Sequence, residues 1–208
     1  MSMLMLILQV FLAFFIASMV VSMFKNKKQK GQQMADLQEK LAAYETITEE
    51  QILNATDDEA IEAVTYHMLD KVDSDYKAAM DEYNEEEKQF FTMYQLQAVC
   101  ESPRNSVNDF FVSAKELVKY VPIMFDELGM PEGSAIFNEA RALYLKFEEE
   151  YKRDIDEVVD ELYNEEEEEA EEKNFFDYTK ELKEIFKSET YKTALAKYVK
   201  DHAERFVG

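Results

Sequence analysis

The chain has 208 residues, of which 45 are Asp or Glu and only 23 are Lys or Arg, so its formal net charge is −22. A protein this acidic is repelled by nucleic acid, because binding requires Lys and Arg to replace the counterions of the phosphates. This balance excludes direct nucleic-acid binding and makes basic or amphipathic proteins the natural partners.

The residue types predict an all-α fold. Four glycines and three prolines supply little of the turn chemistry that a sheet of many strands requires, whereas 15 Phe and 12 Tyr supply ample material for a core. The lone cysteine, Cys100, excludes an intramolecular disulfide, which fits a reducing compartment.

Residues 3–24 carry no charge, and they are followed at once by four lysines, Lys25, Lys27, Lys28 and Lys30. As a helix, this segment would be about 33 Å long, enough to cross the ~30 Å hydrocarbon core of a bilayer. A cleaved signal peptide is the alternative, but its apolar stretch is shorter and follows basic residues. We therefore predict a transmembrane anchor.

The position of the lysines predicts the orientation of this anchor. Because all nearby positive charge follows the apolar run, the positive-inside rule puts the rest of the chain in the cytoplasm and Met1 outside. No acid precedes residue 31, so the segment 31–208 holds 19 basic and 45 acidic residues, a net charge of −26.

Apolar spacing and capping pairs divide this segment into helices. Residues 31–44 are expected to form a polar spacer helix. Thr48 with Gln51 begins a short helix at about 49–53. Thr56 or Asp57 begins a longer helix, which is expected to continue through Tyr76 and Met80 and whose apolar stripe is Ile61, Val64, Met68, Leu69 and Val72.

Two more capping pairs, a proline and a serine predict four further helices. Asn84 with Glu87 begins a helix that stops before Pro103, and Ser106 with Asp109 begins the one that carries Phe110 and Phe111 in the core. Pro122 is expected to be the first residue of a helix that ends at Leu128, with Gly129 left-handed after it. Ser134 is expected to cap the helix that bears Ile136, Ala140, Leu143, Tyr144 and Phe147.

Residues 148–172 are dominated by acids. Ile155, Val159 and Leu162 have the i, i+4, i+7 spacing of a helix on the core, whereas 165–169 form either a solvated helix or an unfolded hinge. Two amphipathic helices follow. The predicted divisions are an anchor at 1–24, a basic juxtamembrane segment and spacer at 25–47, a helical core domain at 48–147, an acidic segment at 148–172 and a helical pair at 173–208.

The stretch 101–111, ESPRNSVNDFF, resembles the central motif of a bacterial all-helical domain family of unknown function that includes acidic DNA-mimic proteins. That motif is Glu, any residue, Asn-Asn-Gly-Gly-Phe, two further residues and two aromatics. The chain keeps Glu101, Phe110 and Phe111, and it has Val107 in place of the first aromatic. The resemblance covers about residues 52–147 and implies the fold of that family.

The turn of the motif differs from the family pattern, because Pro103, Arg104, Asn105 and Ser106 replace the Asn-Asn-Gly-Gly residues. Three residues at this turn, together with the glutamate run, are the candidate partner-binding residues. They are Glu101, Arg104, Asn105, Glu165, Glu166, Glu167, Glu168 and Glu169.

The sequence contains no phosphate-binding glycine loop, HExxH pair, GxSxG elbow or CxxC pair. Cys100 lies on an apolar helical stripe and is expected to be a buried structural thiol, and His67 is expected at a helix surface or boundary. No metal or cofactor site is predicted, and the chain is not expected to be an enzyme.

The leading hypothesis is a membrane-anchored, cytoplasmic, acidic interaction or regulatory protein that binds a basic or amphipathic protein. The alternative is a DNA-mimic-like protein that competes with nucleic acid for a basic DNA-binding protein. A third is a scaffold that places another factor at the membrane.

Overall fold

The computed structural model describes residues 35–72, 80–152 and 173–207, and it divides the chain into two compact units, Met1–Glu45 and Thr46–Gly208. In the first unit, residues 35–43 form a helix, which confirms the described part of the predicted spacer at 31–44.

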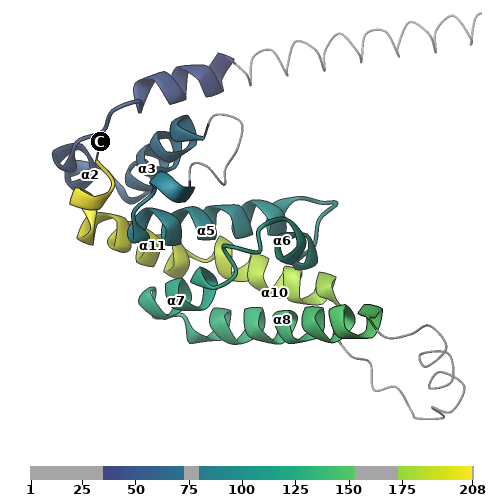
Figure 1. Cartoon of the computed structure of the whole chain (residues 1–208). Helices are drawn as coiled ribbons and strands as arrows, with labels where there is room; N and C mark the ends of the chain where they lie inside the picture. The colour runs from purple at the N-terminus through teal and green to yellow at the C-terminus, as the bar shows by residue number, and fades with distance from the viewer. Residues whose placement is uncertain (1–34, 73–79, 153–172, 208) are drawn as a thin grey trace, which may run out of the picture. The chain divides into compact units, whose positions relative to one another are not determined.

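The second unit is built from helices, and none of its described residues forms a strand (Figure 1). The all-α prediction is therefore confirmed. In chain order the elements are α2 (Glu49–Asn54), α3 (Asp57–Lys71), α5 (Glu85–Glu101), α6 (Val107–Ser113), α7 (Tyr120–Glu127), α8 (Pro131–Lys152), α10 (Phe175–Lys187), α11 (Glu189–Asp201) and the 3-10 turn η1 (Ala203–Arg205).

The predicted capping pairs begin these helices. Thr48 and Gln51 cap α2, Thr56 and Glu59 cap α3, and Asn84 and Glu87 cap α5, each pair with reciprocal side-chain and backbone hydrogen bonds. The cap of α3 is thus Thr56, one of the two residues proposed for it. Each box satisfies two N–H groups that the first helical turn leaves without an intrahelical partner.

The prediction that α3 continues through Tyr76 and Met80 is wrong, because α3 ends at Lys71. The Val72 N–H donates to the Leu69 carbonyl, three residues back, and the Tyr83 hydroxyl donates to the Met68 carbonyl at 2.6 Å. In a continued helix the Met68 carbonyl would accept a hydrogen bond from the Val72 N–H instead. Residues 73–79 lie outside the described residues.

Two predicted helix starts are also wrong, although the predicted helices exist. α7 begins at Tyr120, so Pro122 is its third residue, a position where the missing N–H has no intrahelical partner to lose. α8 begins at Pro131, and Ser134 lies within its first turn. Gly129 has the predicted left-handed backbone, with φ of 68°.

The core surrounds α5, which packs against α3, α6, α7 and α10, while α11 packs against α3 and α8 packs against α7 and α10. Phe110 and Phe111 are fully buried, as predicted, and their rings lie 6.0 and 5.2 Å from that of Phe137 on α8.

The prediction that His67 lies at a helix surface or boundary is wrong. Its side chain is buried, on a helix that packs against both α11 and α5.

None of the helices in the part of the chain that the structure describes is long and apolar enough to cross a membrane. The predicted anchor at 3–24 lies outside that part.

Candidate functional site: an acidic end and a motif turn

Three helices of the second unit begin with runs of acids. We call these residues the acidic end: Glu49 and Glu50 of α2, Asp57, Asp58 and Glu59 of α3, and Glu85, Glu86 and Glu87 of α5. A carboxylate in the first turn of a helix is stabilised by the positive end of the helix dipole. The negative charge of the acidic end therefore lies at the positive ends of three helix dipoles.

The C-terminal turn of the chain brings these three helix starts together. Lys200 of α11 donates to Asp57 at 2.8 Å, and the Arg205 guanidinium lies 3.8 Å from Glu86. The Asn84 side chain donates to the Arg205 carbonyl at 2.7 Å, and α2 packs against η1. In Figure 1 the C-terminus accordingly lies beside α2.

The acids at this end have two different roles. Glu87 is buried, and its carboxylate accepts from the Asn84 backbone N–H at 2.9 Å and from Lys71 at 3.1 Å, so it stabilises the fold. Glu59 is exposed, and the Thr56 backbone N–H and hydroxyl hold the pKa of its carboxyl below the usual range. Glu50 and Asp58 are exposed and point their charge to solvent.

The opposite end of α5 carries the motif turn, residues 101–106. Thr179 of α10 fixes this turn, because its hydroxyl accepts from the Val107 N–H at 2.8 Å and donates to the Phe175 carbonyl at 2.6 Å. Lys183, also on α10, lies 3.5 Å from the Glu101 carbonyl. Asp109 accepts from the Ser106 backbone N–H at 2.7 Å, which confirms the predicted cap of α6.

The three described candidate residues lie at this turn. Glu101 is exposed and accepts from Gln97 at 2.9 Å, Arg104 is exposed at the tip, and Asn105 is half-buried. The structure thus brings these three together. The other five candidates, residues 165–169, lie outside the described residues.

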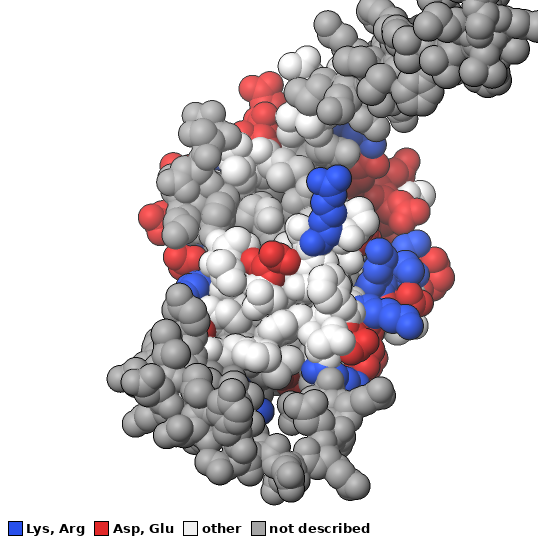
Figure 2. Space-filling model, turned by 90° about the vertical axis from the view of Figure 1, so that its right-hand side faces the viewer, with Lys and Arg blue, Asp and Glu red and all other residues white. Residues whose placement is uncertain are grey.

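The surface on this side differs from the acidic end. Figure 2 shows the face on the right of Figure 1, the side toward which α6 lies, and a broad, largely uncharged area occupies its centre. Val112 of α6 and Phe176 of α10 are large apolar side chains that are 58% and 64% exposed. The 17 residues of α5 separate the two ends by about 25 Å, since a helix rises about 1.5 Å per residue.

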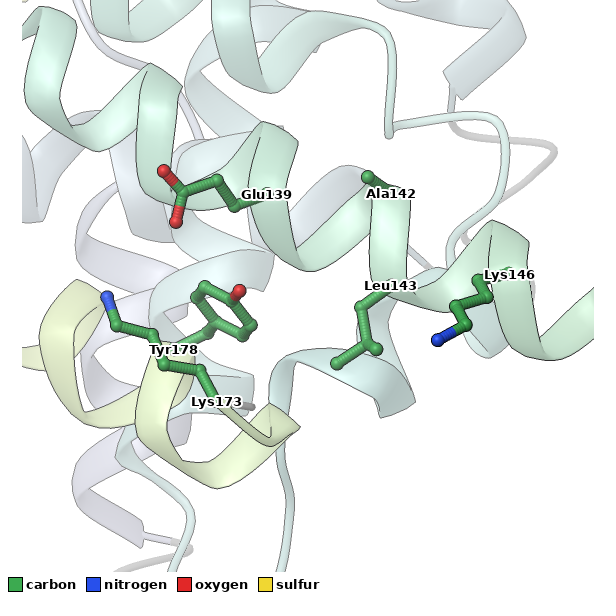
Figure 3. Close-up of a pocket in the computed structure, with 6 residues that line it drawn as sticks. All are labelled: Glu139, Ala142, Leu143, Lys146, Lys173 and Tyr178. Carbon is green, nitrogen blue, oxygen red and sulfur yellow. The ribbon is translucent and has the colours of Figure 1, made fainter. Parts of the chain in front are cut away.

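A groove of about 410 Å³ lies between α8 and α10 (Figure 3). Its lining is Glu139, Ala142, Leu143, Lys146, Lys173 and Tyr178. In Figure 3 Leu143 lies between the Tyr178 ring and Lys146. Lys173 contacts Glu181 at 2.7 Å and lies 5.4 Å over the Tyr178 ring.

Cys100 is a buried thiol, as predicted, and burial raises its pKa to about 12. A thiol with such a pKa stays protonated at neutral pH and is a poor nucleophile. Among the described residues, no group of His, Cys, Asp and Glu side chains has the arrangement of a metal site.

The model of the DMP19-like protein family matches residues 81–202, more than half of the 208 residues. The chain belongs to the DMP19-like protein family. No curated protein and no solved structure matches it.

The match confirms the resemblance and corrects its extent. The predicted range, 52–147, began too early and stopped too soon, because the match runs from the start of α5 through α11. The motif turn and α10 therefore lie within the same family match. Of the acidic end, the match contains the three acids of α5, whereas α2 and α3 precede it.

The acidic end was not predicted as a site, although the sequence identified the capping pairs of α2 and α5. The pairs have local spacing, but their convergence depends on Lys200 and Arg205, more than 100 residues away in the chain. Thr179 was also missed, because a single threonine within an amphipathic helix carries no sign of its contact with Val107.

Proposed function

We propose that this protein is a non-catalytic interaction protein that binds a basic protein partner through the acidic end. The observation that carries the proposal is the convergence of three acid-led helix starts at one place on the second unit. The Cys100 thiol, with its raised pKa, supports the non-catalytic part, because it is a poor nucleophile.

The charge distribution along the chain supports the same surface. Residues 46–152 contain 24 acids and 9 basic residues, whereas 173–208 contain 6 acids and 8 basic residues. The negative field therefore comes from α2–α8 and from the acid-rich residues 153–172, and not from α10 and α11. Such a field accelerates the encounter with a basic partner.

The sequence adds a location to this proposal. The uncharged run at 3–24 and the lysines that follow it support a single membrane-spanning anchor, with the acidic body in the cytoplasm. The interaction would then take place at the cytoplasmic face of a membrane.

The test compares two double variants with the same change in net charge. Glu50→Gln with Asp58→Asn neutralises two exposed acids of the acidic end, neither of which caps its helix. Glu132→Gln with Glu149→Gln neutralises two exposed acids of α8. The full chain and both variants are used to capture basic proteins from native cytosol, and the association rate of the captured partner is then measured against salt concentration.

The acidic-end variant should slow association several-fold and flatten its salt dependence, while the dissociation rate changes little. The control variant should leave both rates near those of the wild type. Equal losses in the two variants would contradict the proposal, because they would show an effect of net charge alone.

A DNA-mimic role is the second candidate function. It is favoured by the membership of the chain in the DMP19-like protein family, because the stretch 101–111 resembles the motif of an all-helical family that includes acidic DNA-mimic proteins. A mimic would occupy the DNA-binding surface of its partner, so duplex DNA should displace the partner from the full chain at constant ionic strength. Release by salt but not by DNA would favour a basic partner of another kind.

A further inference from the structure

One side of α10 carries a row of side chains that the bundle leaves accessible. They follow one another at i, i+4, i+7 and i+11, a spacing that places them on the same side of a helix, and they are Phe176, Lys180, Lys183 and Lys187. We call these four residues the α10 row. Phe176 is 64% exposed, Lys180 and Lys187 are exposed, and Lys183 is half-buried. The row is about 16 Å long, since a helix rises about 1.5 Å per residue.

The α10 row borders the motif turn. Lys183 lies 3.5 Å from the Glu101 carbonyl, and the Thr179 hydroxyl accepts from the Val107 N–H at 2.8 Å, so α10 contacts the chain on both sides of the turn. Arg104, exposed at the tip, is three residues from each of these contacts, so its Cα lies within about 11 Å of both. Figure 2 shows Lys and Arg side chains beside the largely uncharged area of this face.

The cations at this surface outnumber the acids that pair with them. Among the described residues, no acid forms an ion pair with Arg104, Lys180 or Lys183, and the contact of Lys183 is with a neutral carbonyl. Lys187 pairs with Glu184 at 2.9 Å. Lys187 first, and then Lys180 and Lys183, hold the pKa of the Glu184 carboxyl below its usual range. One acid on α10 thus interacts with three lysines.

The other acids nearby do not reverse this balance. Asp109 and Asp177 cap the starts of α6 and α10, where the positive end of each helix dipole offsets their charge. Glu101 and Glu184 remain, so the three lysines of the α10 row and the arginine of the motif turn face two acids. This surface is therefore locally basic on a chain that has 45 acids and 23 basic residues.

The surface fits a partner that carries carboxylates and an apolar side chain. An amphipathic protein segment of about three helical turns has the length of the row, and it can place an aliphatic side chain on Phe176 while its acids face the lysines. An anionic membrane surface fits less well, because it is wide and would also meet Glu101 and Glu184 within the ~8 Å screening length of physiological salt. A narrow row is matched by a single segment.

We propose that the α10 row and Arg104 bind an acidic, amphipathic segment of a second protein partner. Its carboxylates pair with Arg104, Lys180 and Lys183, and its apolar side chain contacts Phe176. This surface lies at the other end of α5 from the acidic end, so the protein can hold an acidic and a basic partner at the same time. The proposal goes beyond the proposed function and does not depend on it.

Binding of two designed peptides to the full chain tests the proposal by fluorescence anisotropy. The aligned peptide is a fluorescein-labelled helix of about 15 residues, in which one Leu and three Glu repeat the spacing of the α10 row. The control peptide has the same composition, with its three Glu on different sides of the helix. The wild type should bind the aligned peptide about tenfold more tightly than the control peptide. Equal affinities, or no binding of either peptide up to about 1 mM, would overturn the proposal.

Variants of the full chain locate the contact. Lys180→Glu should weaken binding of the aligned peptide about tenfold, and Phe176→Ala about fivefold. Arg141→Glu makes the same charge change at an exposed residue of α8 and should leave the affinity within about twofold of the wild type. Equal losses in Lys180→Glu and Arg141→Glu would overturn the proposal, because net charge alone would then explain them.

Two further measurements keep the proposal falsifiable. If circular dichroism shows that Lys180→Glu unfolds the protein, Lys180→Gln replaces it and should weaken binding about threefold, and an unchanged affinity would overturn the proposal. Displacement of the aligned peptide by phosphatidylserine vesicles, but not by phosphatidylcholine vesicles, would overturn it in favour of lipid. Self-association of the full chain that Lys180→Glu abolishes in sedimentation would overturn it in favour of a second copy.

Discussion

The two ends of α5 are stabilised in different ways. The N-terminal end is held by polar contacts, with Asn84 and Glu87 capping the helix and Lys71, Arg205 and Lys200 binding the acids around it. At the C-terminal end Lys183 lies at the Glu101 carbonyl, and the motif turn is followed by α6, whose start is fixed by the Thr179 hydroxyl and whose buried rings pack on Phe137.

This difference distinguishes charged side chains that stabilise the fold from exposed charged side chains that can contact a partner. At the acidic end, exposed acids remain after the capping and ion-pair contacts are made, so this surface can change without loss of the core. At the motif turn, the kept residues Phe110 and Phe111 are buried, so their retention reflects packing. Side chains that contact a partner there would be exposed ones such as Arg104.

The largest expected effect tests the aromatic side of this comparison. Phe110→Ala should lower the free energy of unfolding by about 3–5 kcal/mol, because it leaves a cavity beside Phe137. Urea unfolding followed by circular dichroism measures the loss. Phe176→Ala, at a side chain that is 64% exposed, is the control and should cost less than about 1 kcal/mol. Similar losses in the two variants would contradict the assignment of Phe110 to the core.

The next effect concerns the hydroxyl that fixes the motif turn. Thr179→Val removes the acceptor of the buried Val107 N–H and should cost about 1–3 kcal/mol, since an unsatisfied buried donor is expensive. Thr193→Val, at an exposed position of α11, should stay within about 0.5 kcal/mol of the wild type. An unchanged midpoint for Thr179→Val would mean that the turn does not depend on α10.

Much of this architecture could be predicted from the sequence. The capping pairs at Thr48 and Asn84 depend on residues three positions apart, so they identified the starts of two helices, and the cap of α3 was narrowed to Thr56 or Asp57. Burial of Phe110, Phe111 and Cys100 likewise follows from local apolar spacing. These properties belong to single helices, which is why the sequence is informative about them.

The errors arose where a distant contact decides the outcome. His67 was expected near the surface because its own helix gave no other indication, yet its side chain is buried, and α3 packs against α5 and α11. α8 begins at Pro131, before the predicted cap, and its Gly133 lies so close to Phe125 that an added Cβ would be 2.5 Å from the ring. No local pattern reports such an approach.

The acidic end offers the corresponding test of polar stabilisation. Asn84→Ala removes the side-chain acceptor for the Glu87 N–H and the donor to the Arg205 carbonyl, so it should cost about 0.5–2 kcal/mol. Asn54→Ala, at an exposed residue that caps no helix start, is the matched control. Equal urea midpoints for the two variants would show that α5 does not need its cap. Polar contacts would then not be what stabilises the N-terminal end of α5.

The smallest expected effect on stability is at the tip of the motif turn. Arg104→Ala removes an exposed side chain, so the free energy of unfolding should stay within about 0.5 kcal/mol of the wild type. If this turn contacts a partner, the same variant should raise the dissociation rate of the captured protein while leaving its association rate near the wild-type value. The acidic-end variant should do the reverse, because long-range attraction acts mainly on association. A loss of stability above about 1 kcal/mol in Arg104→Ala would instead give the guanidinium a role in the fold. The exposed side chain at the tip of the motif turn would then stabilise the fold, as the capping and ion-pair contacts do at the acidic end.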